Sequence, residues 1–213
     1  MKKLIDTFIF DLDGTIIDTP NLIMNSFKFA IKEHTDHILT KDETTNVLGH
    51  TLTKAFEPYA NDLNHLNKMI KSFRDYSYKH GSEVLVYEDV IDILTLIKEK
   101  SYKLAIVTSK SRIIALKNLE DLKLANFFDL VVTYDDTLLH KPNKEPLMYA
   151  IDKLESKLEN SIYIGDHEND VKAGKNANML TGLMKYSHRL NEALDLKPDF
   201  VFDSFNDIKN IIK

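Results

Sequence analysis

The chain has 213 residues, 43 % of them hydrophobic and 29 % charged, and a formal net charge of −5. That composition is typical of a globular protein with one moderately large domain, or of a core with a smaller insertion. The absence of cysteine excludes disulfides, thiolate zinc sites and a cysteine nucleophile. Dispersed basic residues predict no nucleic-acid partner, and the apolar runs are too short to predict a membrane segment. Asp6, Asp11 and Asp13 interrupt the N-terminal apolar stretch, so we expect no secretion signal and a cytoplasmic protein.

The first predicted strand, residues 7–10, is short and mostly apolar, and it ends at the motif Asp11-Leu12-Asp13-Gly14-Thr15. In an extended segment residues i and i+2 point the same way, so the carboxylates of Asp11 and Asp13 should be presented together. Two anions so close repel unless a cation lies between them or one is protonated. The motif predicts a nucleophile and a general acid/base at a metal ion. The alternative is an acidic turn, in which Asp-Gly is common.

The next segment, residues 18–83, contains helix signals and no convincing strand. Thr19-Pro20 is typical of an N-cap followed by Pro at the first helical position. A capping box that begins at Thr40 predicts a second, short helix, which Gly49 can close. A third predicted helix carries an apolar stripe made of Leu66, Met69, Ile70, Phe73 and Tyr76.

These helices predict a small cap domain. We place it at residues 18–83, inserted into a core domain of residues 1–17 and 84–213. The two crossings between them should lie near residues 17–19 and 81–85.

A second predicted strand, residues 104–107, follows an amphipathic helix at 90–97 and ends at Thr108-Ser109. A hydroxyl and backbone N–H groups at a strand-to-helix turn are suited to hold phosphate oxygens. The same two residues also suit a plain N-cap for the helix that contains residues 113–119. Both interpretations stay open on this motif alone.

The third predicted strand, residues 130–132, is followed by Lys141-Pro142. A lysine fixed beside a proline can neutralise both a carboxylate nucleophile and an incoming phosphate. By itself, a Lys-Pro pair is usually part of a solvated loop.

A fourth predicted strand, residues 161–164, ends at Gly165-Asp166, and Asp170 lies one helical turn further on. Carboxylates at a strand end are the hard oxygen ligands that Mg²⁺ prefers. The alternative is an Asp N-cap with an acid in the first turn, where the helix dipole favours it. His167 is more often a surface residue than a ligand, and we assign it no role.

The alternation of strands, the last at 200–202, with amphipathic helices predicts βαβ units. Unbroken apolar runs of this length are typical of strands buried on both faces. We therefore expect an α/β fold with a doubly wound, Rossmann-like parallel sheet and an inserted all-helical cap. The polar motifs would meet at the carboxyl ends of the strands, where such sheets bind ligands.

The order Asp-x-Asp, Thr/Ser, Lys, Gly-Asp-x-x-x-Asp between Phe8 and Asp170 resembles the four motifs of the haloacid dehalogenase superfamily. The position of the cap after the first motif resembles that superfamily as well. Residues 8–19, 127–146 and 198–202 most resemble the bacterial PpaX-type inorganic pyrophosphatases, and phosphoglycolate phosphatases are the close second.

The resemblance implies a Mg²⁺-dependent phosphohydrolase that acts on pyrophosphate or a small phosphorylated metabolite. It implies that Asp11 attacks phosphorus and that Asp13 protonates the leaving group and later activates water. Phosphate would be bound by Thr108, Ser109 and Lys141. The metal would be held by Asp11, Asp13, Asp166 and Asp170.

Four other classes of protein share parts of this pattern. A dehalogenase attacks carbon and typically lacks the second acid, so Asp13 argues against it. A phosphomutase of the β-phosphoglucomutase kind shares every catalytic residue and is the runner-up. A phospho-accepting receiver is about half this length. An inactive binding module would be expected to have lost one of Asp11, Asp13, Lys141 or Asp166, and all four are present.

The physiological substrate is not indicated by any motif. Residues of the cap should select the leaving group, and we place this function in the loop at residues 49–54. His50 and Lys54 there, and Lys110 in the core, are candidates to meet a second anionic group, although a solvated loop is an equal alternative. No sequence feature indicates the oligomeric state.

Overall fold

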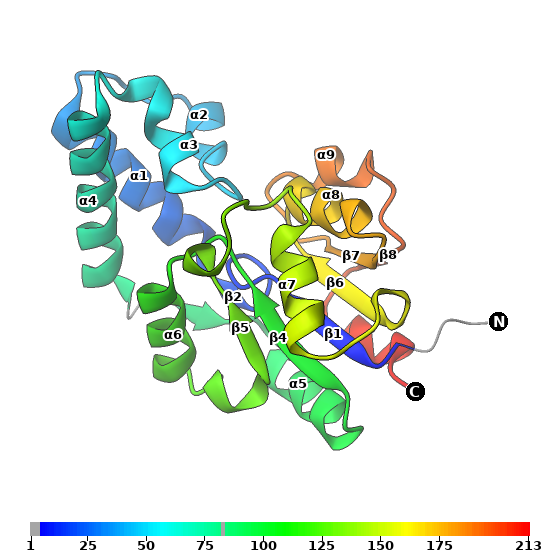
Figure 1. Ribbon diagram of the computed structural model, residues 1–213. Coiled ribbons are helices and arrows are strands. Elements are labelled where there is room, and N and C mark those ends of the chain that lie inside the picture. The colour runs from blue at the N-terminus through cyan, green and yellow to red at the C-terminus, as the bar shows by residue number, and fades with distance from the viewer. Residues whose placement is uncertain (1–4, 82–83) are drawn as a thin grey trace. The chain divides into compact units, whose positions relative to one another are not determined.

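The computed structural model describes residues 5–81 and 84–213, and the chain divides into two compact units (Figure 1). The first unit joins Met1–Ile17 to Val86–Lys213, and the second is Asp18–Leu85. The predicted return crossing at 81–85 includes residues 82 and 83, which lie outside the described residues.

Two short strands mark the passage of the chain between the units. They are β2 (Ile17–Asp18) and β3 (Leu85–Val86), and they pair in a two-stranded sheet. The unit boundary on the return lies between Leu85 and Val86, two residues after the predicted position.

The first unit is built on a six-stranded sheet of order β5-β4-β1-β6-β7-β8, in which every described pair is parallel. Its strands are β1 (Thr7–Phe10), β4 (Lys103–Val107), β5 (Leu130–Val132), β6 (Ser161–Gly165), β7 (Leu180–Met184) and β8 (Phe200–Phe202). The chain builds outward from β1 to one edge and then returns to the other side of β1. This is the Rossmann-type order, with its switch point between β1 and β6. The predicted doubly wound α/β fold is therefore confirmed.

Helices lie on both faces of this sheet (Figure 1). They are α5 (Val90–Glu99), α6 (Arg112–Asp121), α7 (Glu145–Lys153), α8 (Glu168–Asn176) and the short α9 (Leu190–Leu194). This unit also contains the 3₁₀ helices η3 (Ala125–Phe127), η4 (Tyr134–Asp136), η5 (Leu158–Asn160) and η6 (Phe205–Ile211).

Side chains alternate between the two faces along each strand. Ile9 and Tyr163 pack in one apolar cluster with residues of α7 and α8. Phe10 faces the opposite way, and its ring centroid lies 5.4 Å from that of Phe205 in η6. Because both faces are covered, all four residues of β1 are completely buried. Full burial of an Ile or Phe side chain contributes about 1.5–3 kcal/mol to folding.

One strand of the sheet, β7, was not among the predicted strands. It lies between β6 and β8, and all but its first residue are buried. Its sequence, Leu-Thr-Gly-Leu-Met, contains Gly182 at its centre, which weakens the strand signal.

The second unit is helical, apart from its terminal strand residues. It contains α1 (Pro20–His34), α2 (Lys41–Thr45), α3 (Leu52–Phe56), η1 (Glu57–Tyr59) and α4 (Leu63–Lys79). Helices α1 and α4 pack on each other, and Phe27, Phe56 and Met69 are buried between the helices of this unit.

Two details of the second unit differ from the prediction. The capping box at Thr40 is present, but α2 ends at Thr45, and Gly49, with φ of +72°, lies beyond its end. The predicted loop at 49–54 is also wrong in part, because the Thr51 hydroxyl caps α3 at the amide of Lys54. Lys54 is thus a helical residue.

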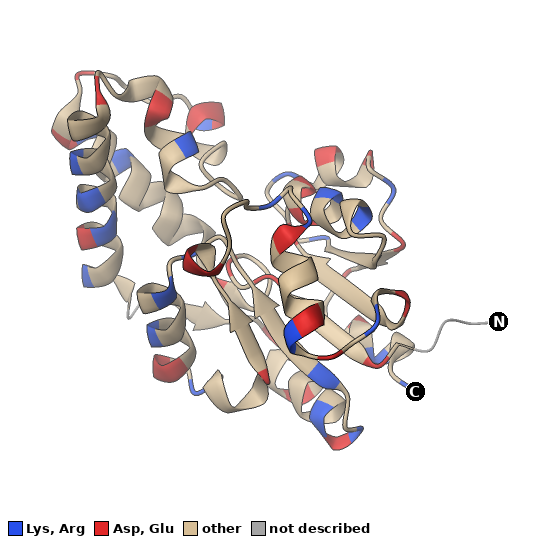
Figure 2. Ribbon diagram, viewed as in Figure 1, with Lys and Arg blue, Asp and Glu red and all other residues tan. Residues whose placement is uncertain are grey.

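Both basic and acidic residues occur along the helices of both units (Figure 2). Within the described residues, no helix is both long enough and apolar enough to cross a membrane.

Candidate active site

The loop after β1 begins with Asp11, whose amide donates to the carbonyl of Ile164 at 2.9 Å. This bond continues the pairing of β1 with β6 and fixes Asp11 at the switch point. The loop then turns through Gly14, which has φ of +77°. A Cβ at Gly14 would lie 2.6 Å from the Asp166 carboxylate, so both the turn and the close approach require glycine.

Lys141 brings two of the predicted motifs together. Its Nζ lies 2.9 Å from Oδ1 of Asp11 and 2.7 Å from Oδ1 of Asp170. The side chain is 5 % exposed. Burial lowers the pKa of Lys141, but the adjacent carboxylates of Asp11 and Asp170 outweigh burial and hold it well above its ordinary value. Lys141 is therefore a permanent cation beside Asp11.

The loop that carries Lys141 is fixed locally. The Lys141–Pro142 peptide bond is cis, and the Asn176 side chain of α8 donates to the Pro142 carbonyl at 2.9 Å.

Asp170 is held by the first turn of α8. The amide of His167 donates to Oδ2 of Asp170 at 3.0 Å, while Oδ1 accepts from Lys141. Burial raises the pKa of Asp170, but the charge and hydrogen bond of Lys141 outweigh burial and lower it below its ordinary value. The N-cap of α8 is His167 and not Asp166, and His167 is 4 % exposed, so the expectation of a surface histidine is wrong.

Asp166 lies between the end of β6 and α8, and the Thr15 hydroxyl donates to its Oδ1 at 3.2 Å. Burial and the charges of Asp170 and Asp11 raise the pKa of Asp166 well above its ordinary value. Burial is also the main reason that the pKa of Asp11 rises to about 7, partly offset by Lys141.

These three carboxylates fit a metal ion. One oxygen from each of Asp11, Asp166 and Asp170 lies within 4.8 Å of the others. Among the described residues, Oδ1 of Asp11 is a buried oxygen that receives no hydrogen bond, since its contact with Lys141 is an ion pair outside hydrogen-bond geometry. A hard divalent cation would reduce the repulsion among these carboxylates, two of which, Asp11 and Asp166, have raised pKa values.

The second acid of the first motif faces a different partner. Asp13 Oδ1 lies 2.5 Å from Nζ of Lys110, and the same ammonium donates to the buried Asn118 of α6 at 2.9 Å. Lys110 therefore holds the Asp13 carboxylate on the side of the loop that faces β4.

Thr108 and Ser109 follow β4, and Thr108 is buried while Ser109 is half-buried. The Thr108 hydroxyl accepts from the Lys110 amide at 3.2 Å. Within residues 5–81 and 84–213, no hydrogen bond or ion pair joins either residue to Asp11. The alternative of a plain N-cap does not hold, because the N-cap of α6 is Ser111.

His50 and Lys54 belong to the second unit, where they lie just before and within α3. Their part in substrate selection stays a prediction.

Sequence reasoning missed one member of the cluster, Tyr163 of β6. Its hydroxyl lies 3.0 Å from Lys141 Nζ, from Asp170 Oδ1 and from the Val107 carbonyl. In the sequence Tyr163 is one residue of an apolar run. The available signal was a phenol in a strand buried on both faces, because a buried Tyr hydroxyl usually has a hydrogen-bond partner.

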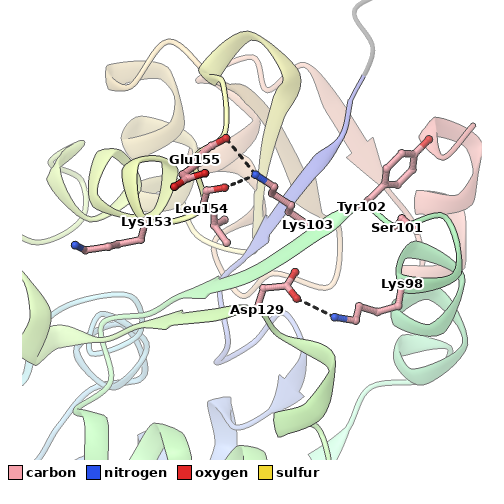
Figure 3. A pocket seen from close by; sticks show the side chains of 8 residues that line it. All are labelled: Lys98, Ser101, Tyr102, Lys103, Asp129, Lys153, Leu154 and Glu155. Atoms are coloured by element: carbon pink, nitrogen blue, oxygen red, sulfur yellow. Dashed lines mark hydrogen bonds and ion pairs between the residues drawn. The ribbon is translucent and has the colours of Figure 1, made fainter.

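Figure 3 shows a shallow pocket at the opposite ends of the strands. Lys103, the first residue of β4, points there and donates to the carbonyls of Leu154 and Glu155. Lys98 forms an ion pair of 2.9 Å with Asp129. Lys98 and Lys103 therefore already have partners within the protein. The pocket is separate from the carboxylates at the switch point.

Comparisons with known proteins agree with this geometry. Residues 8–184 match the family of haloacid dehalogenase-like hydrolases. The chain is 34 % identical over 210 residues to pyrophosphatase PpaX of Bacillus cereus, which covers 98 % of this chain and 96 % of the relative. It is 34 % identical over 210 residues to pyrophosphatase PpaX of Halalkalibacterium halodurans, covering 98 % and 97 %.

Among solved structures, a predicted phosphoglycolate phosphatase from Haemophilus somnus shares the fold with a TM-score of 0.83 at 21 % identity, covering 98 % of both chains. The predicted resemblance is confirmed. The chain belongs to the haloacid dehalogenase-like hydrolases, and it is a relative of the PpaX pyrophosphatases.

Proposed function

We propose that the protein is a Mg²⁺-dependent phosphohydrolase of small phosphorylated substrates that works through an aspartyl-phosphate on Asp11. The observation that carries the proposal is the position of Asp11, a buried carboxylate 2.9 Å from the Lys141 ammonium and grouped with two further carboxylates. A carboxylate nucleophile, a fixed cation and a candidate metal site are the parts that phosphoryl transfer needs.

The proposed metal ligands are Asp11, Asp166 and Asp170, with Asp13 contributing through its carbonyl. Asp170 is a supporting ligand, because both of its oxygens already accept protein hydrogen bonds. When bound, Mg²⁺ would neutralise charge on the phosphoryl oxygens and on the carboxylates around them.

The reaction divides into two displacements. In the first, an Asp11 oxygen forms a bond to phosphorus, the bond to the leaving oxygen breaks, and Asp13 supplies the proton to that oxygen. In the second, Asp13 takes a proton from water, and the water oxygen displaces Asp11 from phosphorus. Lys141, Thr108 and Ser109 would bind the oxygens of the transferring group throughout.

The leaving group should lie beside Asp13 and therefore near Lys110, whose ammonium contacts the Asp13 carboxylate. A cation there favours an anionic leaving group such as phosphate. Together with the identity to PpaX relatives, this supports inorganic pyrophosphate as the first candidate substrate and phosphoglycolate as the second. The cytoplasmic location expected from the sequence stays a prediction.

A phosphate-release screen with Mg²⁺ tests the proposal. It compares pyrophosphate, phosphoglycolate, sugar phosphates and nucleotides, using the wild type, Asp11→Asn and a control, Asp203→Asn, at an exposed acid in an ion pair with Lys185. We expect Asp11→Asn to lose essentially all release and Asp203→Asn to retain it. Release by Asp11→Asn at the wild-type rate would contradict the proposal. Interconversion of sugar phosphates without net release would instead support the phosphomutase alternative.

A further inference from the structure

The hydroxyl of Tyr163 stands at a point where three motifs of the site meet. The side chain is 1 % exposed, and its oxygen lies 3.0 Å from the carbonyl of Val107, the last residue of β4. It lies at the same distance from Lys141 Nζ and from Asp170 Oδ1. One hydroxyl thus connects β4, the Lys141 loop and α8.

The direction of these hydrogen bonds follows from their chemistry. Lys141 has only donors, so the Tyr163 oxygen accepts from it and uses its single hydrogen toward Val107 or Asp170.

An ammonium group has three N–H bonds. Two of those of Lys141 lie in hydrogen-bond geometry with Asp170 and Tyr163. Asp11 Oδ1, 2.9 Å away, is an ion-pair partner outside that geometry. Tyr163 and Asp170 therefore hold the ammonium from the protein side, which leaves one N–H for the reacting groups.

We infer that Tyr163 is a positioning residue for phosphoryl transfer, which acts by orienting the Lys141 ammonium and the Asp170 carboxylate through its hydroxyl. The inference rests on the proposed function, since Lys141 must bind the transferring phosphoryl group. Tyr163 touches neither substrate nor metal in this role. It fixes where the Lys141 ammonium and the Asp170 carboxylate lie when the phosphoryl group is transferred.

Tyr163→Phe removes the hydroxyl and keeps the ring that packs against α7 and α8. We expect kcat for an aryl phosphate to fall about 10–100-fold, because small misplacements of positioning groups have effects of this size. KM should change much less. The inhibition constant of orthovanadate, which mimics the transferring phosphoryl group, should rise roughly in parallel with the loss in kcat.

The matched control is Thr181→Val on the neighbouring strand β7. Thr181 is completely buried, and its hydroxyl donates to the exposed Asp199 at 2.8 Å, so the variant also deletes a part-buried side-chain hydrogen bond, between β7 and the segment before β8. Thr181→Val should lower the unfolding temperature without changing kcat or vanadate inhibition.

The possible results separate the inference from the proposed function. Wild-type kinetics and vanadate inhibition in Tyr163→Phe would overturn the inference and leave the function standing. Equal losses in both variants, in proportion to their unfolding temperatures, would show a purely structural role and overturn it as well. A wild type inactive on every phosphate tested would overturn the proposed function and the inference together.

A second measurement covers the case in which Tyr163→Phe does not fold. Replacement of Tyr163 alone by 4-fluorophenylalanine keeps the ring and fills the space of the hydroxyl with a fluorine, which cannot donate a hydrogen bond and is a much poorer acceptor for Lys141. A fall in kcat with a parallel rise in the vanadate inhibition constant supports the inference, and unchanged values overturn it.

Discussion

Asp11 combines burial with a surplus of nearby negative charge. Three carboxylates, Asp11, Asp166 and Asp170, gather around one ammonium, Lys141, so the fully ionised cluster carries a charge of −3 + 1 = −2. A single divalent cation would balance that charge. The charge of Lys141 outweighs burial at Asp170, whose pKa is lowered. At Asp11 it does not, and the pKa of Asp11 is raised.

Asp13 can be separated from Asp11 by experiment. In Asp13→Asn, attack by Asp11 on an aryl phosphate with a good leaving group needs no acid, whereas hydrolysis of the acyl-phosphate needs a base. We expect the variant to accumulate one covalent phosphate, detected by intact mass spectrometry. The double variant Asp11→Asn with Asp13→Asn is the control and should stay unmodified. Steady turnover by Asp13→Asn without a phosphorylated species would mean that another group activates water.

Gly14 should be essential for the metal site. Gly14→Ala places a Cβ 2.6 Å from the Asp166 carboxylate and forces an L-residue to φ of +77°, at a cost of about 1–2 kcal/mol. Asp166 must move, so we expect kcat/KM to fall by at least about 10-fold. Gly81→Ala is the control, since no atom of the described residues lies within 4 Å of an added Cβ there. Equal activity of the two variants in phosphate release would exclude a strict requirement at Gly14.

At the scale of elements, prediction from sequence worked where one local signal decides the structure. Strands β1, β5 and β8 coincide with the predicted segments, because apolar runs of three or four residues have few alternatives in a covered sheet. The capping box at Thr40 and the Pro at the start of α1 were recognisable for the same reason.

Elements that depend on distant residues were not predictable. β7 contains Gly182, where a Cβ would lie 2.8 Å from the Phe202 ring and 2.9 Å from Ile164. The glycine is there because β8 and β6 supply bulk around it, which a local pattern does not show. For the same reason the sequence predicted the motifs of the site but not the contacts of Tyr163 or Lys110, which join residues far apart in the chain.

The packing of α8 on β7 leads to a prediction at this scale. Gly174 of α8 faces Thr181, and a Cβ at Gly174 would lie 2.5 Å from the Thr181 methyl carbon. We expect Gly174→Ala to destabilise the protein by about 1–3 kcal/mol, the usual range for overpacking, despite the higher helix propensity of Ala.

Thr181→Ser should rescue Gly174→Ala, because it removes the clashing methyl group and keeps the hydroxyl that donates to Asp199. Denaturant unfolding of the two single variants and the double variant measures the coupling. Strictly additive effects would show that the contact between α8 and β7 is not the cause.

For the molecule as a whole, the proposed chemistry is confined to one of the two units. Every residue of the proposed chemistry lies in the first unit, on the loops after β1, β4, β5 and β6 or in the first turn of α8. The second unit has a separate apolar core around Phe27, Phe56 and Met69. We expect the second unit to select the substrate, and substitutions there would leave the residues of the proposed chemistry in place. The motifs of the first unit therefore indicate the reaction class and not the substrate.

The last prediction concerns stability and pH. Burial raises the pKa of Asp11 from 3.8 to about 7, so the folded protein binds a proton there more tightly than the unfolded chain. The stability from that proton is fully present below pH 3.8 and is lost as pH rises through about 7. A cation at the Asp11 carboxylate competes with the same proton. Mg²⁺ should therefore raise the unfolding temperature more at about pH 8 than at about pH 5, measured by thermal denaturation against a chelator control.

In Asp11→Asn the amide has no proton to lose, so without Mg²⁺ it should be more stable than the wild type at the higher pH. Its Mg²⁺ response should be small, and any pH dependence that remains in it should come from Asp166, whose pKa is also raised, while Asp203→Asn should behave as the wild type. A wild-type response to Mg²⁺ that is equal at both pH values would show that Asp11 is not the group at which metal and proton compete.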